Sequence, residues 1–124
     1  MEHEAKIITF ITLAQSIFDN DLKGITKFNC ISFYHFLLDG LEKKRDRLLA
    51  QDDEKFMIYD VVIELLSRFD KVPEQEVANL IKYKDYFIDY TKEKTGISDN
   101  DCKKYAEHLK NDVLIKASVF LKLK

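Results

Sequence analysis

Apolar side chains recur at helical spacing along almost the whole chain, and they are densest from Phe28 to Leu41, FNCISFYHFLLDGL. At about 100° per residue, the apolar residues of this stretch cover all of a helix except a narrow strip. Two rings, Phe28 and Phe36, fall inside that strip, where a two-faced helix carries polar residues. We therefore expect a central helix that is either covered on nearly all sides or shows two rings to a partner.

The same spacing predicts four further helices. The helix that holds the aromatic stretch should open at Thr26 or Lys27. The other four are expected over Glu2–Asp19, Phe56–Phe69, Pro73–Lys94 and Ser98–Leu121. The helix Phe56–Phe69 confines its polar residues to one stripe, so it should pack along the first half of the aromatic helix. The pattern predicts an all-α, single-domain bundle of about five helices over residues 1–124.

Local signals mark the boundary before the last helix most clearly. Ser98 as N-cap with Asp101 three residues later resembles a capping box, and Ile97 and Cys102 stand at the hydrophobic staple positions. Gly96 is placed to end the preceding helix in the left-handed conformation. These signals predict a tight turn between the last two helices.

Three other positions constrain the packing. Gly40 lies inside a helical pattern, which suggests the close approach of another helix or a small bend. Asp52 or Asp53 is suited to cap the helix that follows. In the last helix, three apolar residues lie off the inner face, so its final turns should be enclosed or contact another molecule. These residues are Leu114, Ile115 and Val119.

Composition and charge narrow the function classes. Among 124 residues there are three glycines and one proline, which favours long helices over a sheet. The formal charge of −2, with acids and bases interleaved, gives no basic footprint for nucleic acid. No apolar run is long enough to span a membrane, and the N-terminus MEHEAKII does not resemble a signal peptide. We expect a cytoplasmic protein.

The chain has two cysteines, Cys30 and Cys102, which lie far apart in the sequence on apolar helical faces. Two buried, reduced thiols are expected, and a single disulfide is the alternative. For catalysis, Cys30 points away from His35, and Cys102 is flanked by Asp99 and Asp101, which oppose a thiolate.

Metal-binding patterns are incomplete. The stretch DNDLKG, Asp19–Gly24, begins like a calcium loop, but Lys23 and Cys30 stand where the fifth and twelfth ligands belong. Neither His35 nor His108 follows a glutamate by three residues, as di-metal helical bundles require. We therefore expect no cofactor, no metal and no enzymatic activity.

Two surfaces remain as candidate sites. The first is the outward face of the helix Pro73–Lys94, where tyrosines lie among acids. Tyrosine is enriched in interface cores, and acids complement a basic partner, although such a face can also be merely solvated. This candidate site consists of Lys82, Asp85, Tyr86, Asp89, Tyr90 and Glu93.

The second candidate surface is the strip on the aromatic helix, with Phe28, His35, Phe36 and Asp39. His35 and Asp39 are one turn apart, so the alternative is a buried histidine satisfied by the aspartate. Between the two surfaces we favour the first, because packing gives no evident reason for Tyr86 there.

Two segments of the chain are similar to a known family: IYDVVIELLSRFDKVPE, Ile58–Glu74, and ITFITLAQSIF, Ile8–Phe18. The chain resembles the helical immunity proteins that neutralise bacterial toxins, of the colicin D immunity type. The resemblance implies a partner-binding protein that blocks a toxin domain, often a nuclease, with acidic groups that mimic phosphate. It transfers no individual binding residue.

The expected function is thus a non-enzymatic protein-binding module, an immunity protein for a basic, nuclease-type toxin domain. The alternative is a secretion chaperone or a helical subunit of a larger assembly, with an apolar interface. An enzyme that uses Cys102 or the Asp60–Glu64 pair is the third interpretation.

Overall fold

The computed structural model describes residues 9–10, 12–17, 22–26, 28–68, 71–83 and 85–123, and these form helices joined by short turns. No strand occurs among them, so the all-α prediction is confirmed. After helical residues 9–10 and 12–17 come α2 (Cys30–Ala50), α3 (Phe56–Ser67), α4 (Glu74–Lys82), α5 (Tyr86–Thr95) and α6 (Asp99–Lys122).

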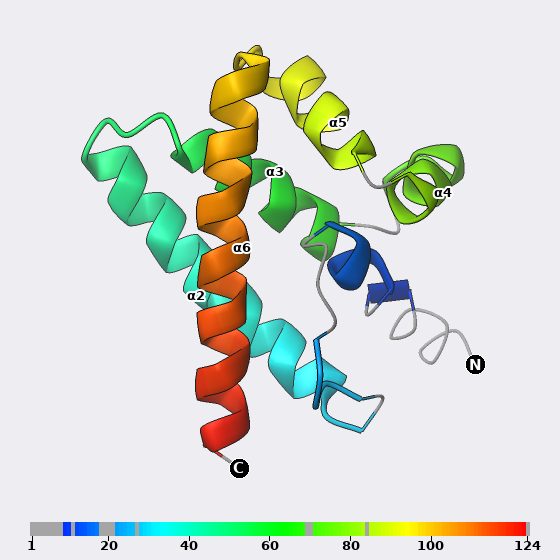
Figure 1. Ribbon diagram of the computed structural model, residues 1–124. Helices are drawn as coiled ribbons and strands as arrows, with labels where there is room; N and C mark the ends of the chain where they lie inside the picture. Colours follow the sequence, from blue (N-terminus) through cyan, green and yellow to red (C-terminus); the bar gives the residue numbers. More distant parts are fainter. Residues whose placement is uncertain are drawn as a thin grey trace.

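The aromatic helix α2 packs antiparallel to α3, and α6 crosses in front of both (Figure 1). Tyr34 donates a hydrogen bond to the carbonyl of Leu66 at 2.9 Å near one end of the α2–α3 pair. Arg45 binds the carboxylate of Asp60 at 3.0 Å near the other end. The packing of α3 predicted for the first half of α2 therefore continues along its second half.

The helix α6 is fixed to the pair by rings and by one buried hydroxyl. The ring of Phe120 packs against Phe33 and Phe36, with centroid distances of 5.4 and 5.6 Å. Tyr59 on α3, which is buried, donates a hydrogen bond to Asp112 on α6. The three long helices thus share one core.

Gly40 permits a close crossing, as its position within the helix suggested. A Cβ atom there would lie 2.7 Å from Cε of Lys116, so any larger residue would displace that side chain. The close approach is between the α2 backbone and the Lys116 stem, not between two helix backbones.

The turn between α5 and α6 follows the prediction. The Ser98 hydroxyl accepts a hydrogen bond from the Asp101 backbone N–H at 3.3 Å, and Ile97 and Cys102 are both buried. Gly96 has φ of 75°, and its N–H donates to the Lys92 carbonyl. Capping and burial together fix the angle at which α6 leaves the turn.

One predicted helix start shifts, and one predicted helix cap differs. The helix α2 begins at Cys30 rather than at Thr26, because Asn29 binds the preceding turn: its side chain accepts from the Thr26 N–H and donates to the Gly24 carbonyl, both at 2.8 Å. The helix α3 starts at Phe56 as predicted, but its N-cap is Lys55 rather than Asp52 or Asp53, and Asp53 instead accepts a hydrogen bond from the Lys55 N–H at 3.0 Å. The predicted ends at Glu2, Asp19 and Phe69 lie outside the described residues.

The predicted helix Pro73–Lys94 is wrong: it is two helices, α4 and α5, separated at Tyr83, which has extended backbone angles of −112° and 112°. The Ser16 hydroxyl lies 2.7 Å from the carbonyl oxygen of Leu80 and 3.0 Å from that of Ile81. It thereby satisfies acceptors that a continuous helix would have bonded internally. In Figure 1 the two helices lie at an angle to each other.

The outer face of α6 keeps apolar side chains at the surface. Leu114, Ile115 and Val119 expose 42%, 59% and 42% of their area, so the described residues do not enclose them. None of the described helices combines the length and the hydropathy needed to cross a membrane.

Candidate functional site

The break between α4 and α5 divides the surface that the sequence grouped together. Lys82 lies at the end of α4, and the others stand on α5 or at its N-cap, Asp85. The charges of Asp85 and Asp89 act on Lys103 of α6: the pKa of Lys103 is raised by its hydrogen bond to Asp99 and further by these two charges. Lys92 also lies 3.9 Å from Asp89. This half is therefore electrostatically matched within the protein.

Tyr86 is not the spare aromatic residue that the sequence suggested. Its ring is half-buried against the core, and its hydroxyl donates to the Glu76 carboxylate at 2.8 Å. Because α5 starts anew at Tyr86, its phase differs from that of one long helix. The ring therefore turns toward α4, so packing does account for it.

The other half of the surface gathers acids from three helices around two rings. The pKa of Tyr90 is raised by burial and by the negative charges of Glu64 on α3, Glu76 on α4 and Glu93 on α5. We call these three glutamates with Tyr86 and Tyr90 the tyrosine–acid cluster. No ion pair to another described residue engages Glu64 or Glu93.

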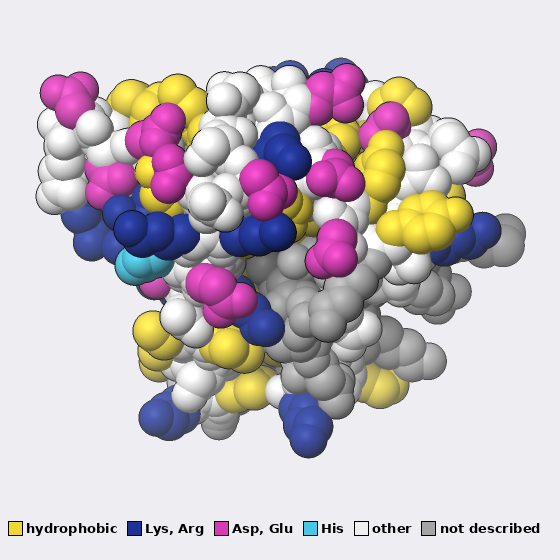
Figure 2. Space-filling view, turned by 45° about the horizontal axis from the view of Figure 1, so that its top comes forward, with side chains coloured by type: hydrophobic (Ala, Val, Ile, Leu, Met, Phe, Trp, Pro, Cys, Tyr) yellow, Lys and Arg dark blue, Asp and Glu magenta, His cyan; other side chains and the backbone are white. Residues whose placement is uncertain are grey.

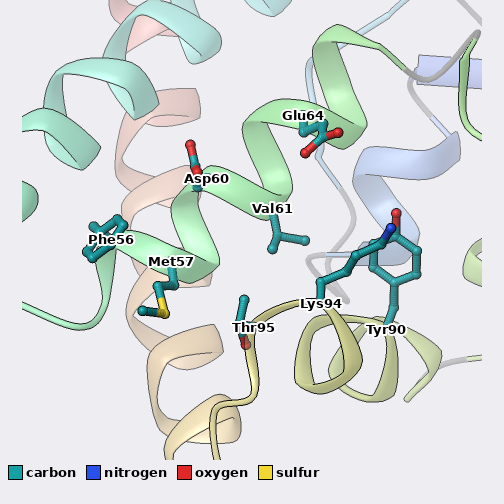
Figure 3. Close-up of a pocket in the computed structure, with 8 residues that line it drawn as sticks. All are labelled: Phe56, Met57, Asp60, Val61, Glu64, Tyr90, Lys94 and Thr95. Atoms are coloured by element: carbon teal, nitrogen blue, oxygen red, sulfur yellow. The ribbon is translucent and has the colours of Figure 1, made fainter.

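A groove of about 340 Å³ opens beside the cluster, between α3 and α5. Apolar side chains of α3 form one wall, and the end of α5 forms the other (Figure 3). We call it the α3–α5 groove. It is lined by Phe56, Met57, Asp60, Val61, Glu64, Tyr90, Lys94 and Thr95.

The charged residues of the α3–α5 groove differ in the contacts that they make with other side chains. Asp60 points away from Tyr90 in Figure 3, and its carboxylate is bound by Arg45 at 3.0 Å. Lys94 reaches across the Tyr90 ring, with its ammonium nitrogen 5.4 Å from the ring centroid. Glu64 is exposed on the opposite wall. The groove thus joins an apolar wall to an unpaired carboxylate and an aromatic face.

The wider surface around α5 carries many acidic side chains. Figure 2 brings forward the face that carries α5 and the start of α6, and acidic side chains are spread across it with apolar side chains and with lysines or arginines between them. Negative charge next to apolar and aromatic area is the composition that complements a basic protein surface.

The second predicted surface does not form one continuous site. Phe28 is 87% exposed, whereas Phe36 is half-buried between Phe120 and the Lys116 ammonium group, which lies 5.7 Å from its ring. The alternative prediction, a buried His35 that is satisfied by Asp39, is wrong.

His35 and Asp39 are both exposed, and Asp39 binds Lys43 at 2.9 Å. An aspartate on a solvated helix face is reached most easily by a lysine one turn later, and that geometry competes with the histidine.

Both cysteines considered for catalysis are buried, and Asp60 is bound by Arg45, whereas Glu64 is exposed. Cys30 and Cys102 are buried and are not joined in a disulfide, and burial raises the pKa of both thiols. Within the described ranges no group of three or more His, Cys, Asp or Glu residues is arranged to hold a metal ion. Residues 18–21, which include the first part of the calcium-like stretch, lie outside the described residues.

The sequence reasoning missed Glu64 and Glu76 as members of the site. Glu64 was visible on the polar stripe of α3, but its proximity to Tyr90 depends on how α5 packs. Glu76 lies in the first turn of α4, where an acid already has a local role because it complements the helix dipole. Its bond to Tyr86 arises only because the chain turns between α4 and α5.

Comparison of the chain with models of protein families, with curated proteins and with solved structures finds no match.

Proposed function

We propose that this protein is a non-enzymatic binding module that captures a basic protein domain, as an immunity protein captures its toxin. The observation that carries the proposal is the α3–α5 groove, which Glu64 and Tyr90 line together, next to Tyr86 with its hydroxyl bound to Glu76. The resemblance of Ile58–Glu74 and Ile8–Phe18 to immunity proteins names the class of partner.

In the proposed interface, charged groups and apolar area contribute to binding in different ways. Unpaired carboxylates steer a basic partner and accelerate its association, while rings and the groove wall supply desolvated contact area. Because Tyr86 and Tyr90 are already held by packing and, at Tyr86, by a hydrogen bond, little side-chain entropy is lost when a partner binds. A groove of about 340 Å³ lies at the lower end of the range for ligand pockets, which suits one or two inserted side chains.

The test is capture from the native host with two matched baits, followed by a growth assay. The double variant Glu64→Lys/Glu93→Lys reverses the charge of two glutamates in the tyrosine–acid cluster. The control variant Glu42→Lys/Glu107→Lys makes the same change in net charge at exposed positions of α2 and α6. We expect wild type and control to retain one basic protein that the cluster variant loses.

The captured protein is then expressed alone and with each variant. We expect it to stop growth, and we expect co-expression of the wild type or the control variant, but not of the cluster variant, to restore growth. Equal rescue by the cluster variant would contradict the assigned surface. A captured protein without toxicity would contradict the immunity role.

A second candidate function is a secretion chaperone or a helical subunit of a larger assembly. It is favoured by the exposed apolar side chains Leu114, Ile115 and Val119 on α6. The double variant Ile115→Lys/Val119→Lys separates the two: loss of the captured protein with this variant, and its retention with the Glu64→Lys/Glu93→Lys variant, would favour the second function.

A further inference from the structure

The Tyr90 ring in the α3–α5 groove already holds a cation from its own helix. Lys94 follows Tyr90 by one turn, and its ammonium nitrogen lies 5.4 Å from the ring centroid, within the distance of a cation–π contact. The contact shows a positive charge positioned over the face of this ring. It is observed independently of the acids themselves.

The Lys94 contact is weak and reversible. Its side chain is exposed, and no ion pair to a described residue holds it in place. A single exposed cation–π contact is among the weaker interactions in a protein, and lysine has a flexible stem. A competing cation that also binds a carboxylate would therefore displace it.

We propose that the α3–α5 groove is the docking site for an arginine side chain of the protein partner, and that Lys94 is a built-in competitor for that site. This inference rests on the proposed function and names the chemistry by which the partner is recognised. The partner's guanidinium group takes the place of the Lys94 ammonium over Tyr90, with Glu64 as its counter-ion.

The groove fits arginine better than lysine for two reasons. A guanidinium group is planar, so it stacks on an aromatic face and pairs with a carboxylate at the same time. The apolar side chains of Met57 and Val61 line the groove, and they would cover the methylene stem. Charge complementarity is supplied by Glu64, because the other groove carboxylate, Asp60, is bound to Arg45.

If Lys94 competes with the partner's arginine, its removal should raise the affinity of the groove, whereas removal of an ordinary groove residue would lower it. Loss of Lys94 should tighten arginine binding, because the incoming group no longer has to displace a bound cation. The expected gain is roughly two- to fivefold, the value of one exposed cation–π contact. The variant Glu64→Gln keeps the shape of the wall but removes the counter-ion, so it should weaken binding.

The experiment uses the full chain and N-acetyl-arginine amide as the probe. Methyl resonances of Met57 and Val61 are followed by NMR during titration of wild type, Lys94→Ala, Glu64→Gln and Lys104→Ala. The last variant removes an exposed lysine of α6 and serves as the matched charge control. We expect tighter binding with Lys94→Ala, weaker binding with Glu64→Gln, and wild-type affinity with Lys104→Ala.

Several outcomes would overturn the inference. Unchanged or weaker binding in Lys94→Ala would show that Lys94 does not compete for the groove. An equal gain in affinity in Lys104→Ala would show that the effect comes from net charge alone. Equal binding of N-acetyl-lysine amide would contradict the choice of arginine. Because no natural partner is used, failure here with continued capture of a basic protein would reject only this inference and leave the proposed function standing.

Discussion

At the scale of single residues, the hydroxyl of Tyr86 changes how its exposed neighbours should be interpreted. The sequence placed this ring outward among acids, where its removal would cost little stability. In the structure the ring packs against the core and its hydroxyl binds Glu76 at 2.8 Å. Tyr86 therefore contributes to folding as well as to any interface, and substitutions there have to be chosen to separate the two.

The variant Tyr86→Phe keeps the ring and removes only the hydrogen bond. We expect a loss of about 0.5–1 kcal/mol in the free energy of unfolding, measured by urea denaturation. The variant Tyr86→Ala also removes the packed ring, so it should lose distinctly more. If both variants matched wild type, the packing of this ring would be disproved. The exposed Tyr83, replaced by Phe, serves as a control.

The two thiols allow a second test at residue scale. Cys30 and Cys102 expose 1% and 0% of their area, and burial raises the pKa of both. A neutral, inaccessible thiol is a poor nucleophile. We expect a thiol reagent to label them slowly in native buffer and rapidly in denaturant, as followed by mass spectrometry. Fast native labelling of either residue would show that its helix opens or that its burial is wrong.

At the scale of elements, sequence pattern located the helices well where the signals are local. The Ser98 cap, Gly96 and the polar stripe of α3 depend on residues a few positions apart, and each appears where the pattern placed it. The break before α5 is different. Apolar spacing continues through Tyr83, and the group that satisfies the freed carbonyls is Ser16, 64 residues away from Leu80. Spacing along one helix cannot report such a contact.

The Ser16 hydroxyl gives a prediction at this scale. In Ser16→Ala the carbonyls of Leu80 and Ile81 lose their donor in a part-buried setting. We expect stability to fall by about 1 kcal/mol and hydrogen exchange to accelerate in the last turn of α4. The exposed Ser118 of α6, replaced by alanine, is the matched control. Equal exchange in both variants would mean that the hydroxyl does not hold the break.

At the scale of the whole molecule, the all-α class follows from composition and periodicity, but the candidate site does not. Half of the predicted face on α5, Asp85 and Asp89, interacts with lysines of the protein itself, Lys103 on α6 and, for Asp89, Lys92 on α5. The other half becomes a site only when α3 brings Glu64 and α4 brings Glu76 beside Tyr90. Helical phase predicts which side of one helix is polar; it does not predict which polar sides of different helices meet.

The hydrogen bond between Tyr59 and Asp112 connects α3 to α6 through the core. Loss of the Tyr59 proton should therefore lower the free energy of unfolding of the whole fold. Burial, and then the hydrogen bond to the Asp112 carboxylate, raise the pKa of Tyr59 above the value of about 10 for a free tyrosine. Below about pH 10 this group carries its proton in both the folded and the unfolded chain, and its contribution to stability is complete. As pH rises further, the unfolded chain loses the proton that the folded chain keeps, so stability falls.

The variant Tyr59→Phe lacks this proton, and its stability should decline less steeply above about pH 10, by up to about 1.4 kcal/mol per pH unit. At neutral pH it should be less stable than wild type by about 1–2 kcal/mol, because Asp112 loses its donor in a part-buried position. Urea denaturation at neutral and alkaline pH measures both effects. Tyr105, whose hydrogen bond to Glu54 raises its pKa to about 12, should show the same sign when replaced by Phe. Parallel stability curves for wild type and Tyr59→Phe across alkaline pH would mean that the hydroxyl is not held in the core as the structure places it.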